Sequence, residues 1–320
     1  MQNPMTSALV TPSKSTSMDW PALPWADWHE TATTLQLWTQ VIGKIRLALA
    51  PRVNHWWHIP LYVTCQGLTT SPMPYGSRML QIDFDFLNHQ LVFQTSDGLR
   101  ETIALVPMTV SSFYRAVMAQ LEALGFHIAI WTMPVEMADP IPFEKDDVHA
   151  AYDAEAAMRF WRVLVQVDRM LSLFRAGFIG KVSPVHFFWG SFDMAVTRFS
   201  GRVAPQHPGG IPHLADSVTQ TAYSHEVSSC GFWPGGPGCE QPVFYAYAYP
   251  APTGFAQAAI QPETAFFNTQ MGEFMLPYDA VRQLPDPDAA ILAFLQTTYE
   301  AAANAGHWER DLLEPRSRFI

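Results

Sequence analysis

The residues best suited to chemistry gather in one stretch, residues 180–202, which reads GKVSPVHFFWGSFDMAVTRFSGR. It contains His186, Trp189, Asp193 and Arg198. Imidazole and carboxylate groups are the usual general acids and bases of enzymes, and a guanidinium binds carboxylates or phosphates through two parallel hydrogen bonds. We therefore expect His186 to act as an acid/base group, with Asp193 orienting or assisting it. Arg198 is expected to hold an anionic group of the substrate, and pairing with one of the surplus acids is the alternative.

A second dense stretch, residues 223–236, reads YSHEVSSCGFWPGG. It adds His225 and Glu226 as candidate catalytic residues. On a strand these neighbours point to opposite faces, so both reach one site only if a bulge intervenes. The plainer interpretation is that these histidines are hydrogen-bonded core or rim residues.

A metal site is the sharper alternative for the same residues. His186, His225 and one carboxylate would form a two-histidine, one-carboxylate site, with Asp193, Glu226 or Glu273 as the acid. The spacing gives no support, since HxH, HExxH and HxxE patterns are absent. We expect no metal, and His186, His225 and Glu226 as ligands if one is bound. The sequence identifies no cofactor.

Aromatic side chains supply a candidate wall for a ligand cleft. Residues 55–58 read HWWH, and four consecutive large rings are costly to expose, so they are buried or line a pocket. Tyrosines at alternate positions in residues 243–249 share one face of a strand, which suits a cleft lining or packing against a helix. The expected substrate-binding residues are His55, Trp57, Trp189, Arg198, Tyr245 and Tyr247.

Two residues are poor nucleophiles. Ser191 lies outside any GxSxG pattern, and Cys230 has no basic neighbour or helix N-terminus to lower its pKa.

The elements that position these residues follow from hydrophobic periodicity. Long helices are predicted over 25–49 and 153–178, each with apolar residues three and four apart. Strands are predicted over 56–66, 78–86, 90–95 and 99–105 in the first half, and over 185–198, 223–231, 243–249 and 273–276 in the second. Shorter helices over 110–124 and 286–303 close each half.

The order of elements suggests an α+β protein made of two pseudo-repeated halves, each a long helix, an antiparallel meander and a shorter helix. Ile-Gly-Lys occurs in both halves, at 42–44 and 179–181, before a proline and a histidine-aromatic run. Convergent composition at helix ends is the alternative. The predicted organisation is a flexible tail (1–19), a first half (20–133), a linker (134–152), a second half (153–308) and a tail (309–320).

Composition excludes several partners. The formal net charge of −10 and the lack of a basic run argue against nucleic acid. No apolar run is long enough for a membrane span, and nothing resembles a signal peptide. Three unpaired cysteines fit a reduced, cytoplasmic chain. A small-molecule ligand is the expected partner, and a homo-oligomer is left open.

Four stretches carry a family resemblance: WPALPW (20–25), HWWHIPL (55–61), SPVHFFWGSFD (183–193) and YSHEVSS (223–229). They look like an uncharacterised bacterial family known only as a domain of unknown function. The resemblance covers about residues 20–308 and implies no activity, cofactor or catalytic residue.

Together these features predict a small-molecule enzyme with a histidine- and aromatic-lined cleft between duplicated halves. Its chemistry would be acid/base or metal-assisted, on a small polar or anionic substrate. A non-catalytic protein that binds a small ligand in the same cleft is the alternative.

Overall fold

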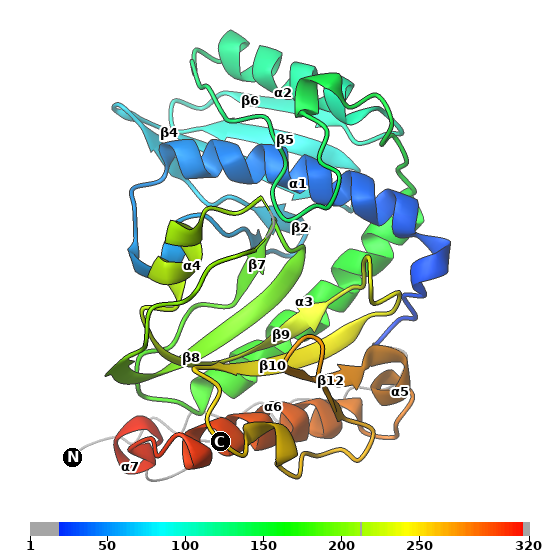
Figure 1. Cartoon of the computed structure of the whole chain (residues 1–320). Coiled ribbons are helices and arrows are strands. Elements are labelled where there is room, and N and C mark those ends of the chain that lie inside the picture. Colours follow the sequence, from blue (N-terminus) through cyan, green and yellow to red (C-terminus); the bar gives the residue numbers. More distant parts are fainter. Residues whose placement is uncertain (1–18, 212, 316–320) are drawn as a thin grey trace, which may run out of the picture.

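The computed structural model describes residues 19–211 and 213–315, so the predicted N-terminal tail lies outside the described residues except for Asp19. In this part the chain forms seven α-helices and two antiparallel sheets of six strands each, which confirms the predicted α+β class. Figure 1 shows the long helix α1 (His29–Leu49) passing between the two sheets.

The first sheet contains the predicted meander. Its three longest strands are β4 (Arg78–Asp85), β5 (Gln90–Thr95) and β6 (Arg100–Ala104), joined by short turns and paired in sequence order. Three short strands complete it: β1 (Tyr62–Val63), β2 (Gly67–Thr69) and β3 (Met73–Tyr75).

Two helices cover the apolar face of this sheet. Trp38 of α1 stacks on Phe113 of α2 (Val110–Ala123) with ring centroids 4.6 Å apart, and Phe113 stacks in turn on Phe84 of β4. The side chain of Thr109 caps α2 by accepting from the amide of Ser112.

The second sheet carries the candidate site. Its strand order is β11-β12-β10-β9-β8-β7. Helices α3 (Ala154–Ala176) and α6 (Pro287–Ala305) pack together and cover one face, and the other face turns toward α1 (Figure 1). The strands are β7 (His186–Phe188), β8 (Asp193–Val203), β9 (His225–Trp233), β10 (Val243–Tyr249), β11 (Phe266–Asn268) and β12 (Glu273–Pro277).

Both predicted histidine-aromatic strands are interrupted by turns. The strand predicted over 185–198 breaks into β7 and β8, because Phe192 adopts a left-handed backbone (φ 61°). The strand predicted over 56–66 is also wrong at its start. His55 and Trp56 have φ values of 53° and 61°, so the HWWH run forms a tight turn before β1.

The hydrophobic periodicity did not predict several short elements. They are α4 (Asp216–Ala222), α5 (Tyr278–Arg282) and α7 (Arg310–Leu313), besides β2, β3 and β11. The described part of the predicted C-terminal tail is ordered around α7, where the carbonyl of Leu313 accepts hydrogen bonds from the amides of Ile179 and Gly180.

The internal duplication is not confirmed. The first Ile-Gly-Lys lies inside α1, where Gly43 makes room for the indole of Trp189. The second follows the end of α3, and Gly180 packs against Leu313 and Phe178. The two tripeptides therefore serve different purposes in the fold.

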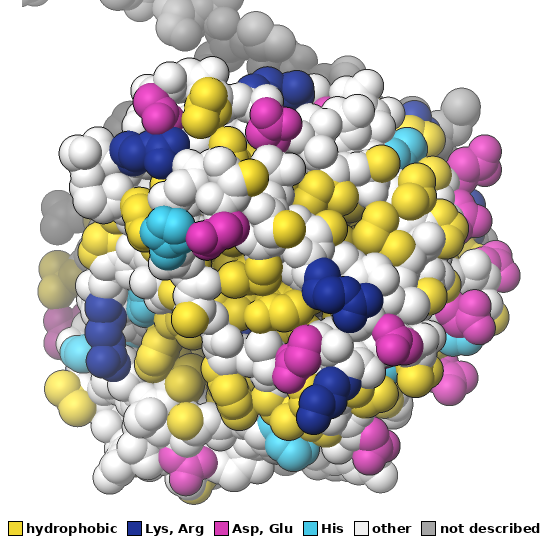
Figure 2. Space-filling model, turned by 90° about the horizontal axis from the view of Figure 1, so that it is seen from above, with side chains coloured by type: hydrophobic (Ala, Val, Ile, Leu, Met, Phe, Trp, Pro, Cys, Tyr) yellow, Lys and Arg dark blue, Asp and Glu magenta, His cyan; other side chains and the backbone are white. Residues whose placement is uncertain are grey.

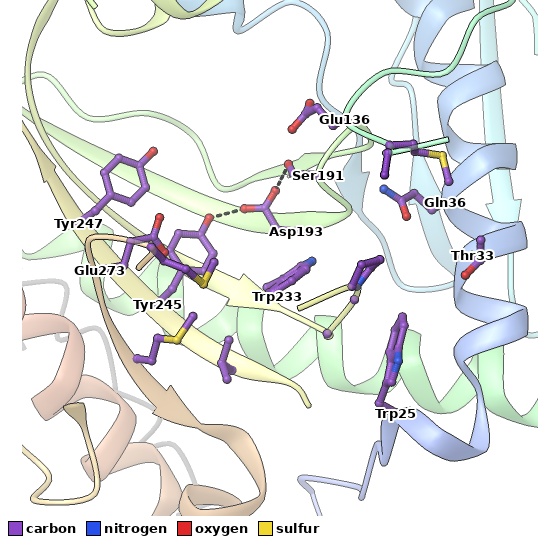
Figure 3. Close-up of a pocket in the computed structure, with 18 of the residues that line it drawn as sticks. Trp25, Thr33, Gln36, Glu136, Ser191, Asp193, Trp233, Tyr245, Tyr247 and Glu273 are labelled. Atoms are coloured by element: carbon purple, nitrogen blue, oxygen red, sulfur yellow. Dashed lines mark hydrogen bonds between the residues drawn. The ribbon is translucent and has the colours of Figure 1, made fainter. Parts of the chain in front are cut away.

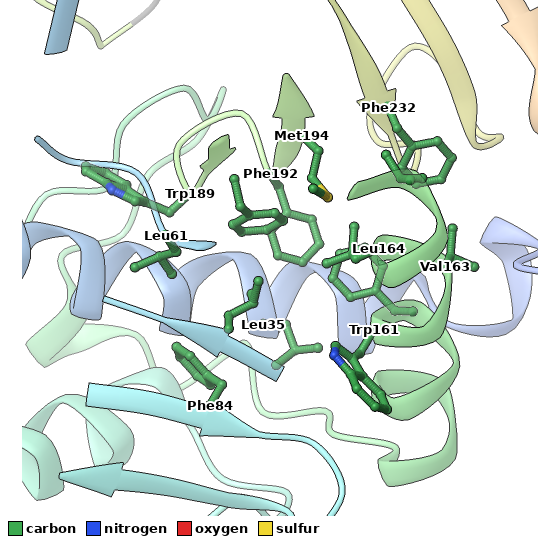
Figure 4. Packing of buried hydrophobic residues seen from close by; sticks show 14 of the residues in the cluster. Leu35, Leu61, Phe84, Trp161, Val163, Leu164, Trp189, Phe192, Met194 and Phe232 are labelled. Carbon is green, nitrogen blue, oxygen red and sulfur yellow. The ribbon is translucent and has the colours of Figure 1, made fainter. Parts of the chain in front are cut away.

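One continuous hydrophobic core joins both sheets (Figure 4). Leu35 of α1, Phe84 of β4, Leu164 of α3 and Phe192 of the β7–β8 turn all belong to it, each at most 3% exposed. Because this core crosses the boundary between the predicted halves, it fixes the second sheet relative to α1.

No helix in the described ranges is long and apolar enough to cross a membrane. On the face shown in Figure 2, Lys and Arg side chains are scattered among acidic and apolar ones and do not form a continuous basic patch.

Candidate functional site

A cleft with two lobes lies between α1 and the open face of the second sheet. Lobe 1 has a volume of about 520 Å³ and is walled by Trp25, Trp233 and the glycine-rich loop after β9. Lobe 2 has a volume of about 360 Å³ and lies under α4 and the HWWH turn. The lobes meet at six shared residues: Glu136, Ser191, Asp193, Tyr223, Tyr245 and Tyr247.

Asp193 occupies the junction of the lobes and is 7% exposed. Its carboxylate accepts one hydrogen bond from the hydroxyl of Ser191 and another from that of Tyr245 (Figure 3). Ser191 belongs to the β7–β8 turn, and Tyr245 comes from β10, two strands away. Side chains from the β7–β8 turn and from β10 therefore both hold the Asp193 carboxylate.

Tyr245 reaches Asp193 because the strand between them carries a glycine. Gly231 of β9 is paired with both Tyr245 and Ala195 of β8. A Cβ atom at Gly231 would overlap the ring of Tyr245 and the carbonyl oxygen of Met194. The missing side chain lets the tyrosine ring lie across β9.

Glu136 reaches the same junction from the segment that follows Met133. The buried amide of Gln40 on α1 holds this segment with two hydrogen bonds of 2.9 Å, one from the amide of Val135 and one to its carbonyl. The carboxyl group of Glu136 then lies over Gly190, where a Cβ atom would overlap its Oε1. Gln40 and Gly190 together position Glu136.

Three acidic groups of the cleft have raised pKa values. Burial, reinforced by the negative charge of Asp193, raises the pKa of Glu136 to about 7, and the same two causes raise that of Glu273 to about 7. Burial also raises the pKa of Asp193, although its hydrogen bonds from Ser191 and Tyr245 favour the ionised form. Glu136 and Glu273 therefore titrate near neutral pH, where the negative charge of Asp193 favours their protonated forms.

Tyrosines complete this junction. Tyr245 and Tyr247 stack with centroids 6.2 Å apart, and the hydroxyls of Tyr223 and Tyr247 are 2.7 Å apart. Burial raises the pKa of each of these three phenols, so they act as neutral donors and acceptors beside the carboxyl groups.

Unfavourable backbone conformations concentrate around the cleft. Of the eight non-glycine residues described with positive φ, five line it or lie within its turns: His55, Trp56, Glu136, Phe192 and His213. Such conformations cost about 1–3 kcal/mol each and cluster at functional sites.

Comparison with known protein families places this chain. A model of the family of unknown function DUF5996 matches residues 20–315. The chain belongs to the DUF5996 family. No curated protein and no solved structure matches it.

In this DUF5996 chain, six of the ten predicted site residues line the cleft: His55, Trp57, Trp189, Asp193, Tyr245 and Tyr247. His55 is bound at both ring nitrogens, with Nδ1 2.9 Å from the carbonyl oxygen of Ala222 and Nε2 2.6 Å from Nζ of Lys181. Trp189 donates its indole N–H to the carbonyl of Ile59.

His186 does not line either lobe. It is 1% exposed, enclosed by the rings of Trp57, Tyr62 and Phe188, and its Nε2 has no hydrogen-bond partner. Burial, together with the positive charges of Arg46 and Arg175, lowers the pKa of His186 to about 3. The imidazole is therefore neutral at physiological pH.

Arg198 lies on the other face of β8 from Asp193. Its guanidinium donates to the carbonyl of Phe174 and lies 3.5 Å from the centroid of that ring and 4.4 Å from that of Tyr299. It packs between the sheet and its covering helices, which separates it from any ligand in the cleft.

His225 and Glu226 point to opposite faces of β9, as the alternation of a strand requires. Glu226 accepts hydrogen bonds from Arg202 and Ser200, away from the cleft. The ring of His225 packs edge-on against His55, and its Nδ1 lies 3.1 Å from the hydroxyl of Ser224. The conditional metal set of His186, His225 and Glu226 is thus not assembled.

Across residues 19–211 and 213–315, no three His, Cys, Asp or Glu side chains are placed to hold a metal ion. The carboxylate of Asp193 instead accepts hydrogen bonds from the hydroxyls of Ser191 and Tyr245.

Sequence reasoning missed Glu136 as a site residue and considered Glu273 only as a metal ligand. Glu136 lies in a proline- and acid-rich stretch interpreted as a linker, where a single functional acid has no distinguishing pattern. The nearest signal was Gln40, a polar residue in the buried part of a long helix, since a fully buried amide requires partners.

Proposed function

We propose that this protein is a small-molecule enzyme that uses Glu136 and Asp193 as a general acid/base pair. The supporting observation is that the buried carboxyl group of Asp193 and the partly buried one of Glu136, both with raised pKa values, face one junction between two ligand-sized lobes. A pair in which only one member ionises easily supplies a proton donor and a proton acceptor at the same pH.

The roles of the two acids follow from their partners. Asp193 accepts hydrogen bonds from Ser191 and Tyr245, which favour its ionised form, so it is assigned as the base. Glu136 has a pKa of about 7 and is assigned as the acid that donates a proton to the departing or developing oxygen of the substrate.

The cleft favours a substrate that is uncharged where it meets these acids. Three carboxyl groups at the junction and in lobe 1 would repel an anion there. Aromatic walls with hydroxyl and amide groups, such as Trp25, Trp233 and Gln36, suit a polyhydroxylated, sugar-like group. A sugar-like polar part is therefore proposed for lobe 1.

The test is turnover of chromogenic nitrophenyl glycosides and nitrophenyl esters by the full chain between pH 4.5 and 8.5. Glu136→Gln and Asp193→Asn should each lower kcat about 10²- to 10⁴-fold, the usual share of general acid/base catalysis. Glu101→Gln, an exposed acid on β6, is the matched control. Equal turnover by all four proteins would refute the assignment.

A non-catalytic ligand-binding protein is the second candidate, and the apolar walls of lobe 2 favour it. It predicts that the panel binds, with thermal stabilisation of the protein, but is not turned over. Glu136→Gln would then change affinity alone.

A further inference from the structure

Lobe 2 differs from lobe 1 in the charge of its lining. Apart from the six shared residues, its titratable groups are Lys44, His55 and His213, and none of them is an acid. The rest of its wall is largely apolar, formed by Leu47, Trp56, Trp57, Ile59, Trp131, Val135, Phe188, Trp189, Phe199, Ile211, Leu214, Val218 and Val227.

Lys44 is the cation of this lobe, and it is only 5% exposed. Its Nζ donates to the carbonyl of Met133 at 2.7 Å and lies 4.6 Å from the ring centroid of Trp131. No carboxylate among the described residues lies within ion-pair distance of it. Burial alone lowers the pKa of Lys44, to about 8.

This environment is costly for an ammonium group. A buried charge is normally paired, and one backbone carbonyl with the aromatic faces of Trp131 and Phe143 satisfies only part of its three donors. Lys44 is thus nine-tenths buried, lines the lobe and has donors left for a ligand.

Lys44 lies on the same helix as two of the residues that line lobe 1, and itself lines lobe 2. Helix α1 faces lobe 1 with Thr33 and Gln36 and lobe 2 with Lys44 and Leu47. At 1.5 Å per residue, Thr33 and Lys44 are separated by about 16 Å along the helix axis. A molecule occupying both lobes would therefore present different groups at the two positions.

We infer that lobe 2 binds an apolar part of the ligand that ends in a carboxylate, and that this carboxylate accepts a hydrogen bond from Nζ of Lys44. This inference rests on the proposed function in placing the reacting bond of the same molecule between the lobes, at Glu136 and Asp193. A single ammonium suits a singly charged carboxylate, whereas phosphate groups are usually bound by arginine forks or several donors. At about 30 Å³ per water molecule, the lobe of about 360 Å³ has room for about 12 waters, enough for a small phenylalkanoic acid.

The experiment compares 4-phenylbutyrate with 4-phenylbutan-1-ol, which has a similar apolar part and no charge. Binding is measured at pH 7 by calorimetry and by quenching of tryptophan fluorescence. The wild type should bind the acid about 10- to 100-fold more tightly than the alcohol, as expected for a hydrogen bond to a charged group.

Lys44→Met should remove this preference while the alcohol still binds. It should also fold, because methionine fills the same buried space without the cost of a buried unpaired charge, and only one hydrogen bond, that to the carbonyl of Met133, is lost. Lys145→Met, at an exposed lysine outside the cleft, is the matched control and should keep the preference. Val218→Trp, which fills lobe 2 from α4, should weaken binding of both compounds, whereas Thr33→Trp in lobe 1 should not.

Equal binding of acid and alcohol to the wild type, or a preference that survives Lys44→Met, would overturn the inference. Its failure is separable from that of the proposed function, because Glu136→Gln should lower kcat about 10²- to 10⁴-fold yet keep the preference for the acid. If turnover depends on Glu136 but the protein does not prefer the acid over the alcohol, the proposed acid/base pair is supported and the proposed carboxylate site at Lys44 is refuted.

Discussion

Gly190→Ala tests the positioning of Glu136 without replacing its carboxyl group. Gly190 has no left-handed backbone, so alanine adopts its conformation without the strain that it would meet at positive φ. The new Cβ would overlap Oε1 of Glu136, and would lie 3.1 Å from its Cδ and 3.4 Å from Cγ2 of Val135.

The size of the effect follows from this overlap. Non-bonded atoms pack at about 3.5 Å, so the carboxyl group of Glu136 has to move by about 1 Å. It cannot retreat by shifting its backbone, because the Gln40 amide holds Val135 on both sides. A displacement of 1 Å at a catalytic group costs about 10²-fold in rate. We expect kcat to fall by about this factor.

The assay is the pH–rate profile of wild type and Gly190→Ala together with their thermal unfolding. Gly98→Ala is the control, since its Cβ meets open space but its φ of 90° is strained. Gly98→Ala should cost about 1 kcal/mol of stability and no activity, whereas Gly190→Ala should show the reverse. Added to Glu136→Gln, Gly190→Ala should cause no further loss. Wild-type turnover in Gly190→Ala would refute the reasoning.

Three further predictions concern the same junction. Burial raises the pKa of Glu273 to about 7, above the ~4.3 of an unfolded chain. This group therefore favours folding below pH ~4, and its contribution to stability is lost as the pH rises through 7. Glu273→Gln should flatten that part of the plot of urea midpoint against pH, and Glu101→Gln should leave it unchanged. Gln40→Leu leaves the buried N–H and C=O of Val135 unpaired, so it should lower the free energy of unfolding by about 2–4 kcal/mol and also lower kcat. Gln36→Leu breaks only one hydrogen bond and is the control. Equal stability of the two variants in denaturant unfolding would contradict this prediction. Tyr245→Phe removes a donor that favours ionised Asp193, so the acidic limb of the pH–rate profile should move to higher pH, and an unshifted limb would exclude Asp193 as the base.

The regular elements could be predicted because their signal is local. The alternation of Leu80, Ile82 and Phe84 places β4, and the spacing of apolar residues places α1 and α3. The Tyr245 and Tyr247 face of β10 was predicted correctly for the same reason, since alternate residues of a strand must share a face.

The composition of the site could not be predicted in the same way. Glu136 lies at the junction of the cleft because the side chain of Gln40, 96 positions earlier in the chain, fixes the backbone of Val135 beside it. Conversely, the side chains of His186 and Arg198 are of types common in active sites, but packing separates them from the cleft. Trp57 packs against His186, and Phe174 packs against Arg198. No spacing rule within one segment reports such distant contacts.

Three polar side chains at intervals of four residues on α1 have a consequence for what changes this fold tolerates. Gln36, Gln40 and Lys44 bind the carbonyls of Gly190, Val135 and Met133, respectively. Inserting one residue between Gln36 and Lys44 would rotate one end of this row by about 100° relative to the other. Both sheets would keep their registers, yet this row could no longer hold both residues 133–135 and the β7–β8 turn, and Glu136 would lose its alignment with Asp193. Length variation in this protein should therefore be accepted in exposed turns such as 96–98 and rejected within α1.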